Sequence, residues 1–264
     1  MASAPVTAQP ARYRPAGRIR RRVRATGIGA LASLALAVLA FLIWANVPYR
    51  ADRGPVIEVW ANGDVQVQYL DKGILMSPVG DSVDLPESPT GLLFVPGARV
   101  EAHAYMSQLS GVVEQHGMTV LITEPTLNLA FFDLRAVDDF TSAAPEVDRW
   151  FVGGHSLGGV RACLMAPGSN VEGLVLFGSY CANDVSESGL QVLSIAGQND
   201  LLLTPATIEQ NAGLVPSDTR FVTIDGANHA SFGDYGVQSG DGERTITSER
   251  MRDELSALLG ELLG

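Results

Sequence analysis

The sequence predicts an α/β domain built on a mostly parallel β-sheet flanked by helices, preceded by one N-terminal transmembrane helix. From residue 56 onwards, continuous apolar runs alternate with amphipathic segments. This pattern is typical of βαβ units whose strands are buried on both faces. A separate run of 23 uncharged residues, 25–47, precedes it. The length of 264 residues allows one domain of ordinary size and this appendage.

The uncharged run is long enough to cross a membrane, since its 23 residues would form a helix of about 34 Å against about 30 Å of hydrocarbon. Residues 1–24 contain seven arginines and no acidic residue, so the positive-inside rule places this basic tail in the cytoplasm. We expect an uncleaved single-pass anchor over 25–47, a linker over 48–55 and an extracytoplasmic domain over 56–264 at the cell membrane. A cleaved signal peptide is the alternative, but no convincing Ala-x-Ala site lies near 43–48.

Charge is divided unevenly between the two parts of the chain. The first 24 residues carry +7, whereas the remainder has 11 basic and 29 acidic residues, a net charge of −18. An acidic domain argues against nucleic acid as a partner. The basic tail suits anionic lipid head groups and predicts the membrane as a partner.

The chain has two cysteines, Cys163 and Cys181. Neither belongs to a CxxC motif or a Cys/His cluster, so no zinc site is expected. Outside the cytoplasm the two thiols can form a disulfide, and otherwise they are two small buried side chains. The sequence leaves both possibilities open.

The elements of the domain follow from apolar periodicity and turn signals. Asn62-Gly63 lies between Val56–Trp60 and Val65–Leu70 and predicts a β-hairpin. Ser248 is the candidate N-cap of a C-terminal helix. Further helices are expected over 101–116, 129–139 and about 205–213, and buried strands over 91–97, 118–125, 149–154, 171–180, 190–197 and 219–226.

A candidate nucleophile follows the strand over 149–154. Gly154-x-Ser156-x-Gly158 matches the nucleophile elbow, a sharp strand-to-helix turn that exposes a serine hydroxyl. The two glycines suit the turn because side chains there would collide with the neighbouring strand and helix. The short motif is weak evidence by itself, so the assignment of Ser156 as a nucleophile depends on whether a base and an acid lie in suitable loops.

Two further loops supply the residue types that a nucleophilic serine requires. Asp200 and His229 each follow a predicted strand, and loops after parallel strands share one edge of the sheet. Histidine can take the hydroxyl proton near neutral pH, and a carboxylate then orients the imidazole. Hydrolases with a nucleophile elbow carry their catalytic residues in the order Ser, Asp, His along the chain, and Ser156, Asp200 and His229 follow that order. Asp184, after the preceding strand, is the alternative acid.

An oxyanion requires two preorganised donors. One is expected from the backbone N–H of Leu157, at the N-terminus of a helix. The second is expected from Ala98, or failing that Gly97, in the loop after 91–97. His103 either contacts substrate or is structural. Asp234 and Tyr235 either border the pocket or lie in a surface loop, and the surface loop is expected.

Several stretches carry a resemblance to a known family: "FVPGARVEAHAY", "TEPTLNLAFFD", "GGHSLGG", "IAGQNDLLLTP" and "GANHASFGDYG". With these the chain resembles the α/β-hydrolase superfamily, and is similar to compact bacterial membrane-anchored lipase/esterase-like or dienelactone-hydrolase-like members. The resemblance covers about Val56 to the C-terminus. It implies a Ser–His–acid triad, no metal and no cofactor. Pro96-Gly97 stands where many members carry His-Gly, a change that keeps the backbone donor.

We therefore expect a serine hydrolase that cleaves carboxylic esters of small molecules or lipids through an acyl-enzyme. An acyltransferase or thioesterase with the same triad remains possible, as does a catalytically silent binding module at the cell envelope. Only about ten residues separate Tyr180 from Leu190, where a cap domain often inserts. An open cleft without a large lid is therefore expected.

Overall fold

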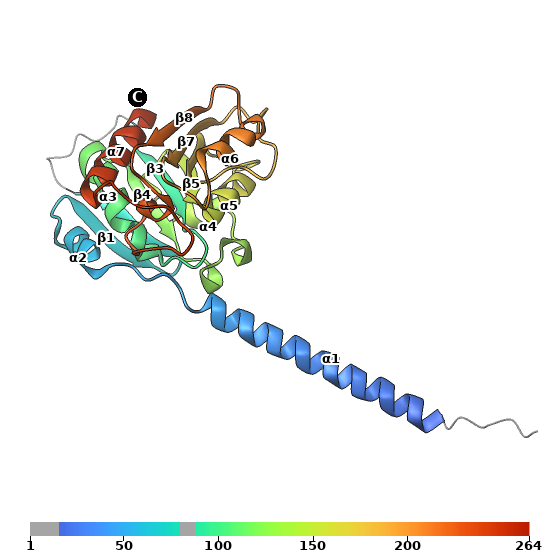
Figure 1. Cartoon of the computed structure of the whole chain (residues 1–264). Coiled ribbons are helices and arrows are strands. Elements are labelled where there is room, and N and C mark those ends of the chain that lie inside the picture. The colour runs from blue at the N-terminus through green and yellow to red at the C-terminus, as the bar shows by residue number, and fades with distance from the viewer. Residues whose placement is uncertain (1–15, 80–87, 264) are drawn as a thin grey trace, which may run out of the picture. The chain divides into compact units, whose positions relative to one another are not determined.

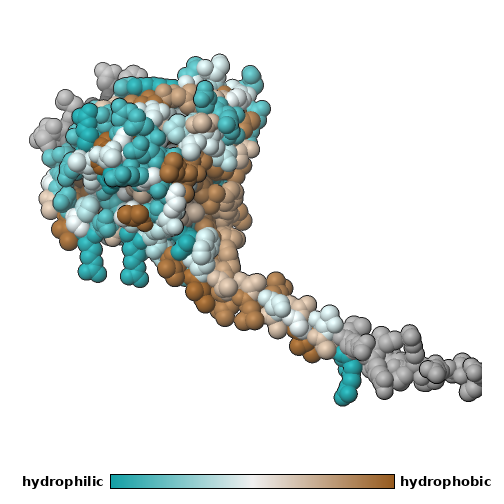
Figure 2. Space-filling model, viewed as in Figure 1, coloured by the Kyte–Doolittle hydropathy of each residue, from teal (hydrophilic) through white to brown (hydrophobic). Residues whose placement is uncertain are grey.

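The computed structural model describes residues 16–79 and 88–263, and the chain divides into two compact units, 1–44 and 45–264. The first contains most of helix α1 (Ala16–Ala45). Its stretch Arg24–Ala45 has a mean hydropathy of 2.4 and is long and apolar enough to span a membrane. Its surface is largely apolar (Figure 2). The first fifteen residues of the predicted basic tail lie outside the described residues.

The second unit is built on a mostly parallel sheet, as predicted (Figure 1). In the described residues it has eight strands in the order β1-β2-β4-β3-β5-β6-β7-β8. The pairs β1–β2 and β2–β4 are antiparallel, and all the others are parallel. The strands are β1 (Val65–Leu70), β2 (Gly73–Pro78), β3 (Thr90–Val95), β4 (Thr119–Thr123), β5 (Arg149–His155), β6 (Gly173–Phe177), β7 (Gln191–Gly197) and β8 (Arg220–Ile224).

Helices cover both faces of this sheet. Side chains of α2, α3 and α7 pack with one face of the sheet, and those of α4 and α5 pack with the other. The α-helices of this unit are α2 (Arg53–Ala61), α3 (Met106–His116), α4 (Val137–Thr141), α5 (Leu157–Met165), α6 (Pro205–Gln210) and α7 (Ser248–Gly260). Short 3-10 segments are Ala102–Tyr105, Thr126–Asn128, Ala130–Phe132, Ala212–Leu214, His229–Phe232 and Glu261–Leu263.

Strand β3 shows how the sequence produces two cores. Leu92 and Phe94 belong to the cluster on the α3 and α7 face, whereas Leu93 belongs to the cluster on the α4 and α5 face. All three are fully buried, because successive strand residues point to opposite faces and both faces are covered. Burial of each such side chain contributes about 1.5–3 kcal/mol.

The predicted hairpin around Asn62-Gly63 is wrong. The segment before it is helix α2, whose Val59 is buried against the core. Asn62 instead closes the turn into β1 with its side chain. Its Nδ2 donates to Glu114 Oε2 at 2.9 Å, and its Oδ1 accepts from Asp64 N–H at 2.9 Å. The hairpin lies one element later, where Leu70 pairs with Gly73 across a two-residue turn. Tertiary packing against α3 has overridden the β propensity of this valine-rich segment.

Two smaller expectations also change. The segment 129–139 contains the 3-10 turn Ala130–Phe132 and the start of α4 rather than one helix. Thr247 caps α7 instead of Ser248, since its Oγ1 accepts from Arg250 N–H at 3.2 Å. The hydroxyl of Ser248 is used elsewhere, donating to the carboxylate of Asp234.

Candidate active site

Ser156 lies at the turn between the central strand β5 and helix α5. Its backbone has φ 53° and ψ −122°, a conformation that non-glycine residues rarely adopt. Its N–H donates to Phe177 O of the neighbouring strand at 3.0 Å, and its C=O accepts from Gly159 N–H at 3.0 Å. Strand and helix together therefore hold the strained residue, with its side chain half-buried.

The glycines around Ser156 allow close contact between backbones. A Cβ at Gly154 would lie 2.6 Å from Val95 O of β3 and 2.5 Å from the carbonyl carbon of Gly158. A Cβ at Gly158 would overlap the same carbonyl of Val95. Helix α5 thus starts directly against the end of β3, which a larger residue at either position would prevent.

His229 and Asp200 form a buried pair. His229 Nδ1 lies 2.7 Å from Asp200 Oδ2, and their side chains are 3% and 0% exposed. The other carboxylate oxygen, Oδ1, accepts from the N–H groups of Leu202 at 2.9 Å and Leu203 at 2.7 Å. These bonds satisfy the carboxylate and fix its direction, so that it orients the imidazole.

The three candidate catalytic residues are brought to one edge of the sheet, after β5, β7 and β8. Gly178, which follows the strand residue bonded to Ser156, would place a Cβ 3.2 Å from Asp200 Oδ2 and 3.3 Å from His229 Nδ1. The ring of His155, next to Ser156, lies 4.4 Å from that of His229 between centroids. Within the described part of the chain, no hydrogen bond joins the Ser156 hydroxyl to His229.

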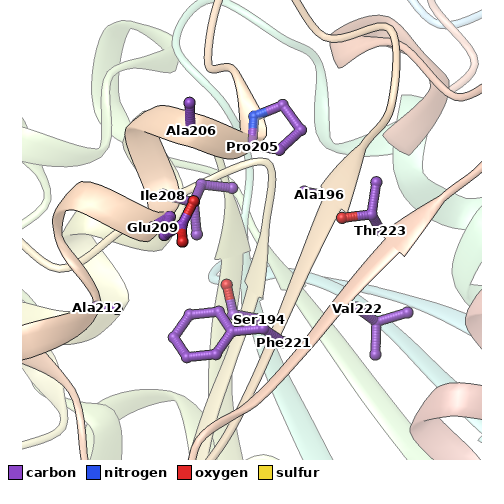
Figure 3. A pocket seen from close by; sticks show the side chains of 10 residues that line it. All are labelled: Ser194, Ala196, Pro205, Ala206, Ile208, Glu209, Ala212, Phe221, Val222 and Thr223. Carbon is purple, nitrogen blue, oxygen red and sulfur yellow. The ribbon is translucent and has the colours of Figure 1, made fainter.

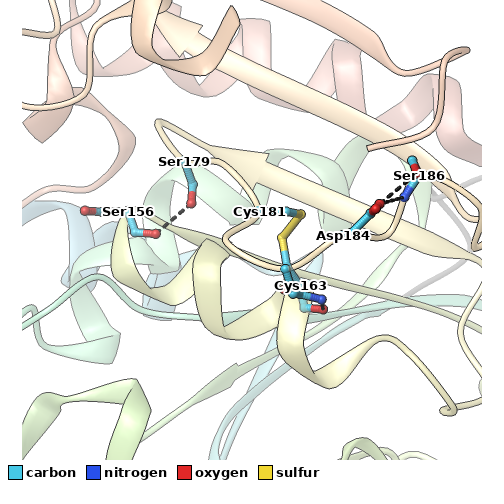
Figure 4. Close-up of a disulfide and its surroundings, with 7 residues drawn as sticks. Ser156, Cys163, Ser179, Cys181, Asp184 and Ser186 are labelled. Atoms are coloured by element: carbon cyan, nitrogen blue, oxygen red, sulfur yellow. Dashed lines mark hydrogen bonds between the residues drawn. A yellow bond between two sulfur atoms is a disulfide. The ribbon is translucent and has the colours of Figure 1, made fainter. Parts of the chain in front are cut away.

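The alternative acid, Asp184, takes no part in this pairing. It is exposed and accepts from the N–H of Ser186 at 3.0 Å and from its hydroxyl at 2.7 Å (Figure 4). These two hydrogen bonds lower the pKa of the Asp184 carboxyl. The geometry therefore favours Asp200 over Asp184 as the partner of His229.

The backbone donors differ in availability. Gly97 N–H donates to the hydroxyl of Tyr105 at 2.9 Å, which argues against the alternative assignment of Gly97 as an oxyanion donor. Leu157 is the first residue of α5, where backbone N–H groups have no partner inside the helix. Neither Leu157 N–H nor Ala98 N–H donates to an acceptor in residues 16–79 and 88–263.

Tyr105 and His155 form a buried layer beneath the site. The hydroxyl of Tyr105 accepts from Gly97 and lies 2.9 Å from His155 Nδ1. Burial raises the pKa of Tyr105, so its hydroxyl stays protonated and can donate to His155 Nδ1 in the tautomer that carries the imidazole proton on Nε2. Burial, and next the nearby His229, lower the pKa of His155 well below its usual value.

A disulfide between Cys163 and Cys181 joins α5 to the loop after β6 (Figure 4). This answers the question that the sequence left open. In the same loop, Ser179 Oγ donates to Ser156 O at 2.7 Å, and Asn183 Nδ2 donates to Cys163 O at 3.0 Å. The loop after β6 is therefore bonded to α5 at several points near the candidate nucleophile.

Several hollows in the described residues lie away from the His229–Asp200 pair. One, of about 370 Å³, lies between α6 and the strands β7 and β8; its lining is mainly apolar, with Glu209 as its charged member (Figure 3). It contains none of the candidate catalytic side chains. Another, of about 380 Å³, is lined by Glu101, His103 and Glu124 among others. His103 also lies 3.0 Å from the Tyr69 hydroxyl.

Sequence reasoning missed some residues that hold the site. Asp241 accepts from His229 N–H at 3.1 Å and from Ala230 N–H at 2.9 Å, and so fixes the loop that carries the imidazole. Asp234 and Tyr235 are buried rather than in the expected surface loop. Asp241 belongs to no sequence motif, because it is an acid in a Gly-rich loop twelve residues beyond His229. In the described residues no cluster of three His, Cys, Asp or Glu side chains is arranged to hold a metal ion.

Comparison with known proteins agrees with this architecture. The model of the alpha/beta hydrolase family matches residues 91–253. Among solved structures, Est1E from Butyrivibrio proteoclasticus is similar, with a TM-score of 0.51 and 12% identity over 75% of this chain and 98% of that chain. At this identity the likeness shows the fold alone. No curated protein matches the chain.

Reduction of the disulfide is expected to destabilise the domain. Closing a loop of 18 residues contributes about 3 kcal/mol to the free energy of unfolding. Urea unfolding of the full chain in detergent micelles, with and without a phosphine reductant, measures the difference. The Cys163→Ser/Cys181→Ser variant should be insensitive to the reductant. Identical midpoints for reduced and oxidised wild type would contradict the prediction.

The lowered pKa of His155 predicts a pH-dependent stability. Above about pH 6.5 the imidazole is neutral in both the folded and the unfolded protein, and its contribution to the free energy of unfolding is then complete. As the pH falls below that value, the unfolded chain takes up a proton that the buried side chain does not, so stability declines by up to about 1.4 kcal/mol per pH unit. Unfolding free energies at pH 7.5 and 5.5 should differ less in His155→Gln than in wild type. Parallel pH profiles of the two proteins would contradict this assignment.

Proposed function

The chain belongs to the alpha/beta hydrolase family, and from that premise we propose that it is a serine hydrolase that cleaves carboxylic esters through an acyl-enzyme. One observation carries the proposal: a serine in a strained strand-to-helix turn and a buried His229–Asp200 pair follow parallel strands at the same edge of the sheet. The strain is maintained by contacts on both sides of Ser156, as expected where backbone geometry serves function.

The first half of the proposed reaction forms the acyl-enzyme. Nε2 of His229 takes the proton of the Ser156 hydroxyl while Oγ bonds to the ester carbonyl carbon. The carbonyl oxygen becomes an oxyanion, which the N–H groups of Leu157 and Ala98 stabilise. His229 then gives its proton to the leaving alkoxide oxygen, the carbon–oxygen bond breaks, and the alcohol departs.

The second half releases the acid. His229 takes a proton from a water molecule, whose oxygen bonds to the acyl carbon. The tetrahedral intermediate collapses, and the imidazolium returns its proton to Ser156 Oγ. Two backbone N–H groups and the His229 Nδ1–H satisfy the oxygens of Asp200. The carboxylate holds the tautomer whose Nε2 can accept the serine proton.

The serine hydroxyl must approach the imidazole for this chemistry. Rotation about the single Cα–Cβ bond of Ser156 moves the hydroxyl without changing the strained backbone. Catalytic hydrogen bonds are often long in unliganded sites and tighten when substrate binds.

The proposed substrates enter an open site. The segment 178–190, where a cap domain would be inserted, contains neither helix nor strand. A short connection of this kind leaves room for an ester carried by a small molecule or protruding from a lipid. Helix α1 supports the proposal that the enzyme is anchored in the cell membrane. The seven arginines of residues 1–24 support a cytoplasmic N-terminus, and the disulfide suits an extracytoplasmic domain.

Removal of the proposed triad should abolish turnover. In full-length protein in micelles, Ser156→Ala and His229→Ala are expected to lower kcat for p-nitrophenyl esters by about 10⁴–10⁶-fold, and Asp200→Asn by about 10⁴-fold. Ser156→Ala should also block labelling by a fluorophosphonate. The matched control is Asp184→Asn, which changes an exposed acid of the neighbouring loop and should retain wild-type turnover.

Two results would overturn the proposal. A folded wild-type chain that neither labels nor hydrolyses esters of any chain length would indicate a silent hydrolase-like domain. Loss of activity in Asp184→Asn with full activity in Asp200→Asn would move the acid to the loop after β6.

A further inference from the structure

We infer that residues 47–52, hereafter the strap, position both halves of the proposed catalytic machinery: the loop that offers Ala98 N–H and the loop that carries His229. The inference rests on the proposed function, which it extends to a segment outside the matched family region. The strap begins two residues after the end of α1, in a stretch that the sequence predicts to be partly linker.

Backbone hydrogen bonds attach the strap to the loop after β3. Tyr49 forms a parallel bridge with Val100. Its N–H donates to Arg99 O at 2.6 Å, and its C=O accepts from Glu101 N–H at 3.1 Å. A segment expected as linker is therefore hydrogen-bonded through Tyr49 to the loop that contains Ala98.

Side chains strengthen the same attachment. The guanidinium of Arg99 lies over the ring of Tyr49, 5.6 Å from its centroid, and donates to the carbonyl of Val47. Farther along, Ala51 N–H donates to Glu101 Oε2 at 3.1 Å. A cation–π contact of this kind is attractive because the guanidinium faces the negative face of the ring.

Arg99 needs this support because its backbone is strained. Its φ is +60°, a left-handed conformation that is sterically unfavourable for an L-residue with a side chain. Its N–H donates to Asn128 O at 2.7 Å, while the strap holds its carbonyl and its side chain. Ala98 directly precedes Arg99, so the conformation held here determines how the chain leaves the proposed oxyanion donor.

The opposite side of the strap contacts the loop after β8. Asp52 N–H donates to Asp234 O at 2.7 Å, and the ring of Tyr49 lies 5.8 Å from that of Tyr235. The Tyr235 ring in turn lies 6.5 Å from that of His155, which is 4.4 Å from His229. One short segment thus bridges the loop of the proposed donor and the loop of the proposed base.

This arrangement gives the strap an effect on rate rather than on binding. Small displacements of donor or base lower the rate of the chemical step by about 10- to 100-fold. They leave substrate affinity largely unchanged where ground-state contacts persist. The structure assigns Tyr49 and Arg99 as positioning residues because they form the contacts between the strap and the loop after β3.

The test uses full-length protein in detergent micelles with p-nitrophenyl esters. Tyr49→Ala and Arg99→Ala should lower kcat by about 10- to 100-fold with KM within about twofold of wild type. Tyr49→Phe, which keeps the ring, should retain most of the wild-type kcat. The kcat of Arg99→Gly should be higher than that of Arg99→Ala, because glycine adopts a positive φ without strain. Arg149→Ala, at the amino end of β5, is the matched arginine control.

A second readout separates this inference from the proposed function. Amide hydrogen exchange over 96–101 should quicken in Tyr49→Ala and Arg99→Ala while the melting temperature shows a folded protein. If Tyr49→Ala does not fold, Tyr49→Leu takes its place. Unchanged exchange and unchanged kcat would overturn the strap's role, even in an active enzyme. An inactive wild type would reject the proposed function, and the exchange data alone would then decide whether the strap holds the loop.

Discussion

The left-handed backbone of Ser156 is the constraint on which the rest of the site depends. Such a conformation persists only where surrounding contacts determine it more strongly than the local strain opposes it. Here the central strand ends at His155, the neighbouring strand accepts the Ser156 N–H, and α5 starts at once against β3. The turn is rigid because it is built into the middle of the sheet, with partner strands on both sides.

Buried polar groups surround that turn, and hydrogen bonds make the burial of several of them tolerable, although His155 Nε2 is buried without a hydrogen-bond partner in the described residues. Two backbone N–H groups and the ring of His229 satisfy the carboxylate of Asp200. The backbone N–H of His229 in turn donates to Asp241. A buried carboxylate without such bonds would cost several kcal/mol. The same bonds fix where the imidazole lies, so stability of the loop and orientation of the proposed base have one physical origin. Tyr105 and His155 complete the layer as neutral groups.

The strands from residue 90 onwards could be predicted because burial on both faces makes each one a continuous apolar run, and polar residues after such runs must meet at one edge. That logic brought Asp200 and His229 together. It failed at α2, where valines favour a strand but packing against α3 decides, and at Asp241, whose role depends on a loop returning to the histidine. Neither the pairing of Cys163 with Cys181 nor the bridge from Tyr49 to Val100 has a local signal.

A crystal structure of the full chain after reaction with a small alkyl fluorophosphonate tests the central claim most directly, because the adduct imitates the tetrahedral intermediate. The phosphorus is predicted to be bonded to Ser156 Oγ, with its phosphoryl oxygen about 2.7–3.1 Å from the backbone nitrogens of Leu157 and Ala98 and with His229 Nε2 facing the oxygen of Ser156. Phosphorus on another residue, or a phosphoryl oxygen turned away from both nitrogens, would contradict the proposed site.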